Sequence, residues 1–310
     1  MTTNQTLARI PVAVVTGFLG TGKSTLLASL FNRYRGRRLA WVVNEFSSLD
    51  MDGQWLRMCG LDVLAVPGGS LFCACLATAF QRVMGGLGRL ARDGCLDGVV
   101  IEASGMSRLD PLDGILVEFH LDDLFQVASV TALVDPATFP VIARTLPCAV
   151  TQVQAADHII INKTDLSSKE VVNGVMDMVR ELVPVASLHV AVRATVDLDV
   201  LVPVRKSGHL PGAWAKSPDP AFSRICVQCP ASMEPERLAA EIQAIGATLY
   251  RAKGLLRVAN GAVKLDWSGG ALQMETVMGI PDCPGLVLFP HAGQEGPAQN
   301  LARRLACGEV

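Results

Sequence analysis

The chain has 310 residues, of which half are hydrophobic and 18% are charged, and its formal net charge is -2 at pH 7. This length suits two domains, and the apolar fraction is sufficient for a large core. The near-neutral charge balance, with no Lys/Arg cluster interleaved with aromatic residues, argues against a nucleic-acid partner.

From Ile10 to about Val204, apolar runs of strand length alternate with amphipathic segments of helix length. Strands that alternate with helices predict right-handed crossovers and a mostly parallel sheet. Residues 1–205 are therefore predicted to form an α/β domain. Its predicted strands are Pro11–Thr16, Arg38–Val43, Val63–Val66, Gly98–Ile101, Ser129–Val134, His158–Ile161 and Pro184–Leu188.

Residues 206–220 are rich in Gly, Pro and Ser and are predicted to link this domain to a second one at residues 221–310. The later pattern favours a small α+β domain with hairpins turning at Asn260-Gly261 and at Ser268-Gly269-Gly270. Asn-Gly between apolar alternations is a strong hairpin signal. The other predicted elements are strands Ser223–Gln228 and Leu286–Phe289 and helices Glu234–Ile245 and Gly296–Leu305.

The first predicted strand leads directly into Gly17-Phe18-Leu19-Gly20-Thr21-Gly22-Lys23-Ser24, a P-loop, and an amphipathic segment follows it to about Tyr34. The backbone N–H groups of such a loop cradle phosphates, Lys23 would reach the β- and γ-phosphates, and the Ser24 hydroxyl would ligate Mg²⁺. This part of the chain is predicted to bind a nucleoside triphosphate. The predicted nucleotide-binding residues here are Gly17, Gly20, Thr21, Gly22, Lys23, Ser24 and Thr25, with Lys23 also catalytic.

A second motif, Asn162-Lys163-Thr164-Asp165, follows the buried strand predicted at His158–Ile161. Ligands of open α/β sheets sit at the carboxyl ends of the strands. The Asp165 carboxylate can accept hydrogen bonds from guanine N1–H and from the 2-amino group, and adenine lacks this pair of donors. Asn162, Lys163 and Asp165 are therefore predicted to bind the base, and the chain is predicted to be a GTPase.

Acidic residues follow two of the strands between these motifs. Glu102 directly follows the predicted strand Gly98–Ile101, and Asp52 lies in the segment after Arg38–Val43. Carboxylates at these strand ends can hold Mg²⁺ directly or through water. Ser24, Asp52 and Glu102 are the predicted magnesium ligands, and Glu102 is the predicted second catalytic residue.

The chain resembles the CobW-type metallochaperone GTPases, relatives of the GTPases that insert nickel into urease and hydrogenase. The resemblance rests on five motifs in order: TGFLGTGKST, NEF…DG, E-x-S-G, ADHIIINKTDL and the later LYRAKGLL at residues 249–256. It implies a P-loop GTPase domain followed by a CobW-type carboxy-terminal domain. It also implies that GTP hydrolysis is coupled to transition-metal delivery or to maturation of a metalloenzyme.

The chain departs from the family pattern at its switch and at its cysteines. Ser47 and Ser48 replace the Gly and Glu of the usual NEFGE, and the family's CxCC is reduced to Cys73-Ala74-Cys75. Two thiolates favour Zn²⁺, Cu⁺ or Co²⁺ but make only half of a tetrahedral site. Glu45, Glu102, a histidine, a client protein or a second CxC from a homodimer partner could complete it. The alternative is that Cys73 and Cys75 are buried thiols at the start of a helix spanning Ala74–Leu90.

The sequence therefore predicts a slow Mg²⁺-dependent GTPase that delivers Zn²⁺ or Co²⁺ to a client metalloenzyme. The alternative is a nucleotide-gated chaperone of a corrinoid or metalloenzyme partner that carries no metal cargo. No signal peptide opens the chain, and its longest uncharged stretch, Val63–Gln81, is broken by Pro67-Gly68-Gly69. A cytoplasmic protein without membrane association is expected.

The chain has nine cysteines, which in a cytosolic enzyme are better interpreted as thiols than as disulfides. Cys226 and Cys229 have CxxC spacing, but no second CxxC would close a zinc site, so a structural role is favoured. Four isolated cysteines are predicted to be small core residues: Cys59, Cys95, Cys148 and Cys307.

Overall fold

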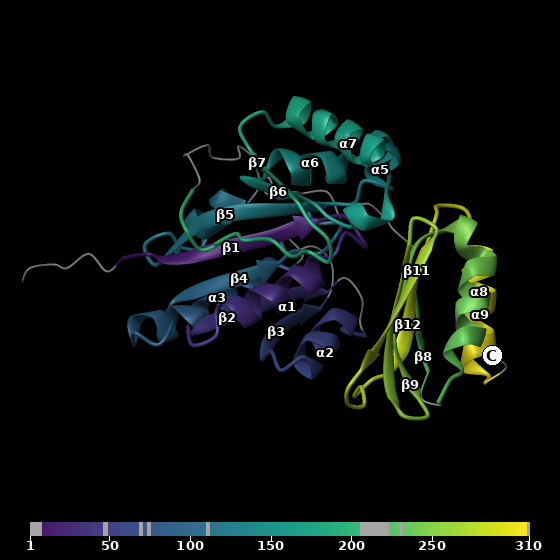
Figure 1. Ribbon diagram of the computed structural model, residues 1–310. Coiled ribbons are helices and arrows are strands. Elements are labelled where there is room, and N and C mark those ends of the chain that lie inside the picture. Colours follow the sequence, from purple (N-terminus) through teal and green to yellow (C-terminus); the bar gives the residue numbers. More distant parts are fainter. Residues whose placement is uncertain are drawn as a thin grey trace, which may run out of the picture.

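The computed structural model describes residues 8–45, 49–67, 71–72, 76–109, 112–204, 223–229 and 232–308. Two sheets stand side by side, and helices cover both faces of the first sheet but only the outer face of the second (Figure 1). The predicted linker, both switch serines, Cys73 and Cys75 lie outside the described residues. Among the described residues, no helix is long and apolar enough to cross a membrane.

The first sheet has seven parallel strands within the described residues, in the order β3-β2-β4-β1-β5-β6-β7. This confirms the predicted α/β class. The strands are β1 (Ile10–Gly17), β2 (Leu39–Glu45), β3 (Val63–Pro67), β4 (Gly98–Glu102), β5 (Phe125–Val134), β6 (His158–Ile161) and β7 (Ser187–Val190). The helices of this domain are α1 (Lys23–Arg33), α2 (Met51–Met58), α3 (Ala77–Arg92), α4 (Leu112–Glu118), α5 (Phe139–Thr145), α6 (Pro147–Gln154) and α7 (Lys169–Leu182), with a 3₁₀ turn η1 at Thr164–Leu166.

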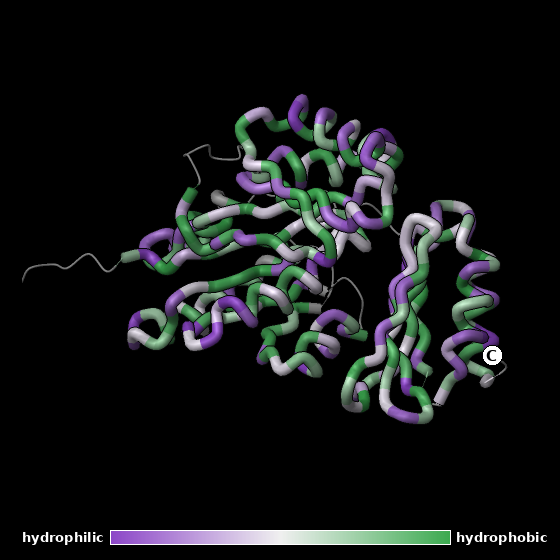
Figure 2. The backbone as a smooth tube through the Cα atoms, viewed as in Figure 1, coloured by the Kyte–Doolittle hydropathy of each residue, from purple (hydrophilic) through white to green (hydrophobic). Residues whose placement is uncertain are grey.

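Strand β1 shows why the strands of this sheet have continuous apolar sequences rather than alternating apolar and polar residues. Val12 and Val14 pack into one hydrophobic cluster, and Ala13 and Val15 pack into another on the opposite face. Because a strand's side chains alternate between faces, a sheet covered by helices on both sides buries every position. Figure 2 shows these strands as mostly hydrophobic, whereas the helices alternate in hydropathy.

Two strand predictions in this sheet were wrong at their starts by three residues or more. The strand expected at Ser129–Val134 begins earlier, at Phe125. The strand expected at Pro184–Leu188 begins instead at Ser187, because the chain first makes a turn in which the Ala186 N–H donates to the Val183 carbonyl. Proline has no N–H to donate to a sheet, which is consistent with its position before the strand.

The second sheet is antiparallel, in the order β11-β10-β9-β12-β8, and confirms both predicted hairpins. Its elements are β8 (Ile225–Gln228), α8 (Pro235–Ile245), the 3₁₀ turn η2 (Gly246–Thr248), β9 (Leu249–Val258), β10 (Gly261–Ser268), β11 (Ala271–Val277), β12 (Gly285–Pro290) and α9 (Glu295–Ala306).

The two faces of this sheet have different partners. In β12, Leu286 and Leu288 pack with helices α8 and α9, whereas Val287 and Phe289 belong to the cluster that contains Met51 and Trp55 of α2. One hydrophobic core therefore continues from the first domain into the second. The sheet face opposite α8 and α9 is held against the carboxyl edge of the parallel sheet.

Candidate nucleotide site

The P-loop backbone adopts conformations that its glycines permit. Gly20 and Gly22 have φ angles of 84° and 104°, in the left-handed region that other residues rarely enter. A side chain at Gly22 would also collide with the Asn162 amide nitrogen. Helix α1 begins at Lys23, immediately after this turn, so its positive N-terminal end faces the loop.

Lys23 is buried beneath the loop, with 6% of its surface exposed. Its Nζ donates to the carbonyl oxygens of Gly17 at 2.9 Å and Phe18 at 3.2 Å. Burial lowers the pKa of Lys23 to about 8, and the charges of Arg251 and Lys253 act in the same direction, against Glu102 and Asp52. The ammonium is thus poorly solvated, and an anion at the loop would stabilise its charged form.

Ser24 and Glu102 meet at the head of the loop. Glu102 ends β4, the strand beside β1, and its Oε1 accepts a hydrogen bond from Ser24 Oγ at 3.2 Å. Both side chains are buried, at 8% and 3% exposure. A hydroxyl and a carboxylate are the hard oxygen donors that fit Mg²⁺. The structure therefore brings together two of the three predicted magnesium ligands.

Asp52, the third predicted magnesium ligand, lines the same cavity as Ser24. It lies in the first turn of α2, where its Oδ2 forms an ion pair of 2.7 Å with Lys253 Nζ from the second domain. Burial alone would raise the Asp52 pKa, but Lys253 and Arg251 hold it well below its usual range. A carboxylate that stays ionised can serve either as this interdomain anchor or as an oxygen ligand.

The predicted base motif is tied to the P-loop. Asn162 Nδ2 donates to the Thr21 carbonyl at 2.8 Å, and its Oδ1 accepts from the Ala194 N–H at 2.7 Å. Lys163, at a left-handed φ of 59°, forms an ion pair of 3.0 Å with Asp135. Asp165 lies in η1 and is exposed, where a base could reach its carboxylate. The motif is thereby fixed beside the loop while its acidic end faces solvent.

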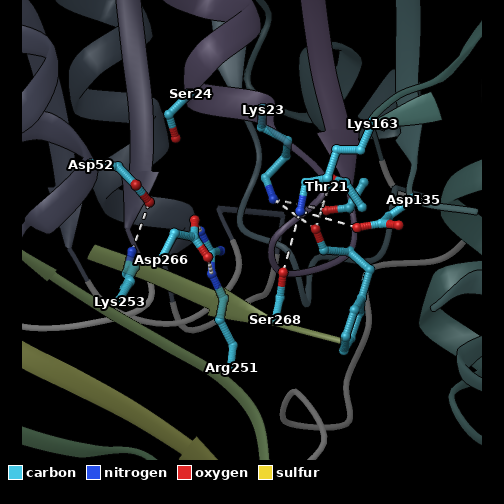
Figure 3. A network of polar contacts seen from close by, with 12 residues as sticks. Thr21, Lys23, Ser24, Asp52, Asp135, Lys163, Arg251, Lys253, Asp266 and Ser268 are labelled. Carbon is cyan, nitrogen blue, oxygen red and sulfur yellow. Dashed lines mark hydrogen bonds and ion pairs between the residues drawn. The ribbon is translucent and has the colours of Figure 1, made fainter. Parts of the chain in front are cut away.

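The antiparallel sheet contributes side chains to this site that the sequence analysis did not assign (Figure 3). Lys163 Nζ donates to Ser268 Oγ at 3.3 Å, and Arg251 is held by Asp266 of the next strand through two hydrogen bonds. Lys264 lies over the Trp55 ring, with Nζ at 3.1 Å from its centroid. The unassigned residues of this sheet are Arg251, Lys253, Lys264, Asp266 and Ser268, and a further unassigned residue, Asp135, directly follows β5 of the parallel sheet.

A sequence signal for part of this set does exist. Arg251 and Lys253 stand two residues apart in a largely apolar strand, and both are buried, at 7% and 5% exposure. Cations at alternate positions point to one face of a strand. That pattern could have indicated a buried charged face, although not its location at the P-loop.

The described cysteines only partly match expectation. Cys148 is buried as predicted, but Cys59, Cys95 and Cys307 are exposed, so their assignment to the core was wrong. Each of the three lies just after a helix or in a loop, and an isolated cysteine carries no periodicity that would reveal its exposure. Cys226 packs toward α2 and Cys229 toward α8 and α9, and burial raises the pKa of the Cys229 thiol to about 11.

Within the described ranges, no three His, Cys, Asp or Glu residues gather as a metal site.

A family model described as "CobW/HypB/UreG, nucleotide-binding domain" matches residues 11–189, more than half of the chain. The loop, the buried lysine and the strand-end carboxylate described above define a P-loop nucleotide-binding protein. The chain belongs to the CobW/HypB/UreG family.

Several curated proteins and solved structures are similar to the chain. "Zinc chaperone CobW" of Pseudomonas aeruginosa is 36% identical over 148 residues, which cover 45% of this chain and 38% of that protein. "Zinc chaperone YjiA" of Escherichia coli is 30% identical, with 52% and 51% covered. "Zinc-regulated GTPase metalloprotein activator 1" of Schizosaccharomyces pombe is 28% identical, with 58% and 45% covered. A crystal structure of Zn(II)-bound YjiA GTPase aligns over 96% of this chain and 99% of that one, at 19% identity and a TM-score of 0.48. The matches span about half, or less, of the length of these curated relatives.

Proposed function

We propose that the protein binds and hydrolyses GTP with Mg²⁺. The observation that carries this proposal is the convergence, at one edge of the parallel sheet, of buried Lys23, the Ser24–Glu102 pair and the Asn162 bridge to the P-loop. Phosphoryl transfer to water depends mainly on positioning and on charge stabilisation, and these groups supply both.

Each group has a defined task in this proposal. Lys23 exchanges its two loop carbonyls for the β- and γ-phosphates, because a phosphate oxygen is a stronger partner for an ammonium than a carbonyl. Ser24 and Glu102, with Asp52 nearby, would hold Mg²⁺, which neutralises charge on the phosphates. Asp165 accepts hydrogen bonds from guanine.

The test is phosphate release from GTP and from ATP by the full chain in Mg²⁺, beside binding of fluorescent GDP and ADP. We expect slow, multiple-turnover release from GTP and tighter binding of GDP than ADP. Equal binding and hydrolysis of the guanine and adenine nucleotides would contradict the role of Asp165. Nucleotide binding without any phosphate release would indicate a nucleotide-binding scaffold.

We further propose that nucleotide binding is coupled to delivery of Zn²⁺ or Co²⁺ through Cys73 and Cys75. The support is the family, the names of three relatives, and a buried side chain between the two regions. Asn44 Oδ1, at the end of β2, accepts from the Leu71 N–H at 2.8 Å and from the Ser104 N–H at 3.3 Å. Leu71 lies just before the cysteines, and Ser104 lies just after Glu102. A change around Glu102 can therefore reach the cysteine segment through one hydrogen-bonded amide.

Chelator competition tests the coupling. Zn²⁺ and Co²⁺ are titrated under reducing conditions with Mg²⁺-GDP and with a non-hydrolysable GTP analogue, using Cys73→Ser/Cys75→Ser as the cysteine-free variant and Cys95→Ser as an exposed control. Coupling of about 1–3 kcal/mol would change metal affinity between several-fold and about a hundredfold.

The second candidate is a nucleotide-gated chaperone of a corrinoid or metalloenzyme partner without metal cargo. The reduced Cys73-Ala74-Cys75 motif favours it, because two thiolates make only half of a tetrahedral site. Metal affinity that responds neither to the nucleotide nor to the double cysteine variant would favour this candidate.

A further inference from the structure

Arg251 of the second domain lies beside the P-loop. It lies on β9, and its Cδ is 3.9 Å from the position that a Gly20 side chain would occupy. It lines one small cavity together with Lys23, Ser24 and Thr25. Only 9% of its side chain is exposed. A residue more than 200 positions along the chain thus reaches the phosphate-binding loop.

The guanidinium is oriented by a neighbouring carboxylate. Arg251 Nε donates to Asp266 Oδ1 at 3.3 Å, and Nη2 donates to Oδ2 at 2.6 Å. A guanidinium carries five N–H donors in a rigid fork, so one edge can hold a carboxylate while another holds a phosphate. Lysine could not do both in a fixed geometry, because it has no planar fork.

The cavity has an excess of positive charge. Among the described residues that line it, the cations are Lys23, Arg251 and Lys264, and the anions are Asp52 and Asp266. Asp52 is already paired with a further cation, Lys253. Buried cations in this number are costly unless an anion joins them.

We propose that Arg251 is a phosphate-binding residue that donates to the terminal phosphate of a bound nucleoside triphosphate, with Asp266 as its positioning residue. This inference rests on the proposed GTPase function. It gives the second domain a direct contact that distinguishes a triphosphate from a diphosphate. Loss of the terminal phosphate would remove the ligand that joins β9 to the P-loop, and the sheet would then be held there by its protein contacts alone.

The competing explanation is that Arg251 and Asp266 form an ion pair that only stabilises the second domain. Arg304 and Glu241 provide the matched control for it. They form a similar two-bond pair at 2.8 and 2.6 Å between α9 and α8, on the side of the sheet facing away from the P-loop. Removing Arg304 reports the effect of losing such a pair without losing a contact to the loop.

The experiment is a fluorescence titration of the full chain in Mg²⁺ with labelled GDP and with a labelled, non-hydrolysable GTP analogue. We expect Arg251→Ala to weaken binding of the triphosphate analogue at least about tenfold, since one charge-assisted hydrogen bond to the terminal phosphate is lost. Binding of GDP should weaken less than about threefold. Arg304→Ala should leave both affinities within about twofold. Arg251→Lys and Asp266→Asn should fall between wild type and Arg251→Ala for the triphosphate only.

Each outcome decides the proposal. Equal weakening of both nucleotides, or wild-type binding by Arg251→Ala, would overturn it. If Arg251→Ala does not fold, as judged by thermal unfolding, the triphosphate affinity of Arg251→Lys decides the proposal. That variant keeps the positive charge and loses only the planar guanidinium donors. If the wild-type chain binds no guanine nucleotide, the GTPase proposal fails first. Normal wild-type binding with an unaltered Arg251→Ala would leave the GTPase proposal standing and refute only the role of Arg251.

Discussion

The two sides of the candidate nucleotide site differ in how their residues are brought there. The parallel-sheet side is assembled from strand ends: β1 delivers the P-loop, β4 delivers Glu102 and β6 delivers Asn162. The antiparallel-sheet side is assembled from alternate positions within strands, where β9 contributes Arg251 and β10 contributes Asp266. The first side follows a general rule of parallel sheets, whereas the second depends on how two domains dock.

Helix α2 of the first domain joins the two sides through polar contacts with the second domain. Lys253 of β9 pairs with Asp52 of α2 across 201 residues of sequence. Gln54, also on α2, exchanges hydrogen bonds with the backbone N–H and carbonyl of Cys283 at 2.9 and 3.3 Å. Helix α2 is therefore one of the elements that connect the two sides, and Asp52 lies within reach of residues from both.

The largest expected effect is on the parallel-sheet side. Lys23→Ala should weaken GTP binding at least about a hundredfold, because charge-assisted hydrogen bonds to two phosphates are lost, and each contributes about 1.5–3 kcal/mol. Fluorescent nucleotide titration and phosphate release measure this. Lys169→Ala, at the exposed start of α7, should behave as wild type. GTP turnover that survives in Lys23→Ala would refute the P-loop assignment.

The next effect concerns the contact between the two sides. Lys253→Met should lower the free energy of unfolding by about 3 kcal/mol, because the buried Asp52 carboxylate loses the Lys253 ammonium that pairs with it. Urea unfolding followed by fluorescence measures the change. The double variant Asp52→Asn/Lys253→Met should recover most of the loss. If the single and double variants are equally destabilised, the pair is not the source of the effect.

A smaller effect should appear at the base. Asp165→Asn should weaken GTP binding about tenfold to a hundredfold, since an amide cannot accept hydrogen bonds from both guanine donors. The same variant should gain affinity for xanthosine triphosphate, because the amide can donate to the 2-carbonyl while accepting from N1–H. Competition titrations with both nucleotides measure the switch. Unchanged preference for GTP would show that Asp165 does not read the base.

The smallest effect is expected far from the site. Glu241→Gln should change the free energy of unfolding by less than about 1 kcal/mol, because both partners of the Glu241–Arg304 pair are partly exposed, at 25% and 34% of their side chains. Nucleotide affinity should not change. A larger effect on binding than on stability would indicate that α8 and α9 also influence the loop.

The sequence located most of the parallel-sheet side, although not Asp135, because most of its parts are local motifs at strand ends. Gly17 to Ser24 and Asn162 to Asp165 carry their geometry in consecutive residues, and Glu102 follows a buried strand. Arg251 and Asp266 could not be placed in this way. An antiparallel strand shows from its alternation which residues share a face, but not which surface that face will meet.

Other predictions from the sequence were wrong where the sequence has no periodicity to guide them. Cys59, Cys95 and Cys307 are single residues at the ends of helices or in loops, so nothing distinguished an exposed thiol from a buried one. The strand at Ser187 was predicted three residues early because apolar composition continued through the turn before it. The domain bounds, the metal role of Cys73 and Cys75 and the delivery of metal to a client metalloenzyme remain predictions.

Hydrogen exchange of the full chain, with and without a Mg²⁺-bound non-hydrolysable GTP analogue, tests most directly whether the two sides form one site. The account predicts slower exchange in the P-loop and at Asn162, together with slower exchange in the β9–β10 hairpin around Arg251 and Asp266. Protection confined to the parallel-sheet side, with exchange in β9 and β10 unaffected, would contradict it.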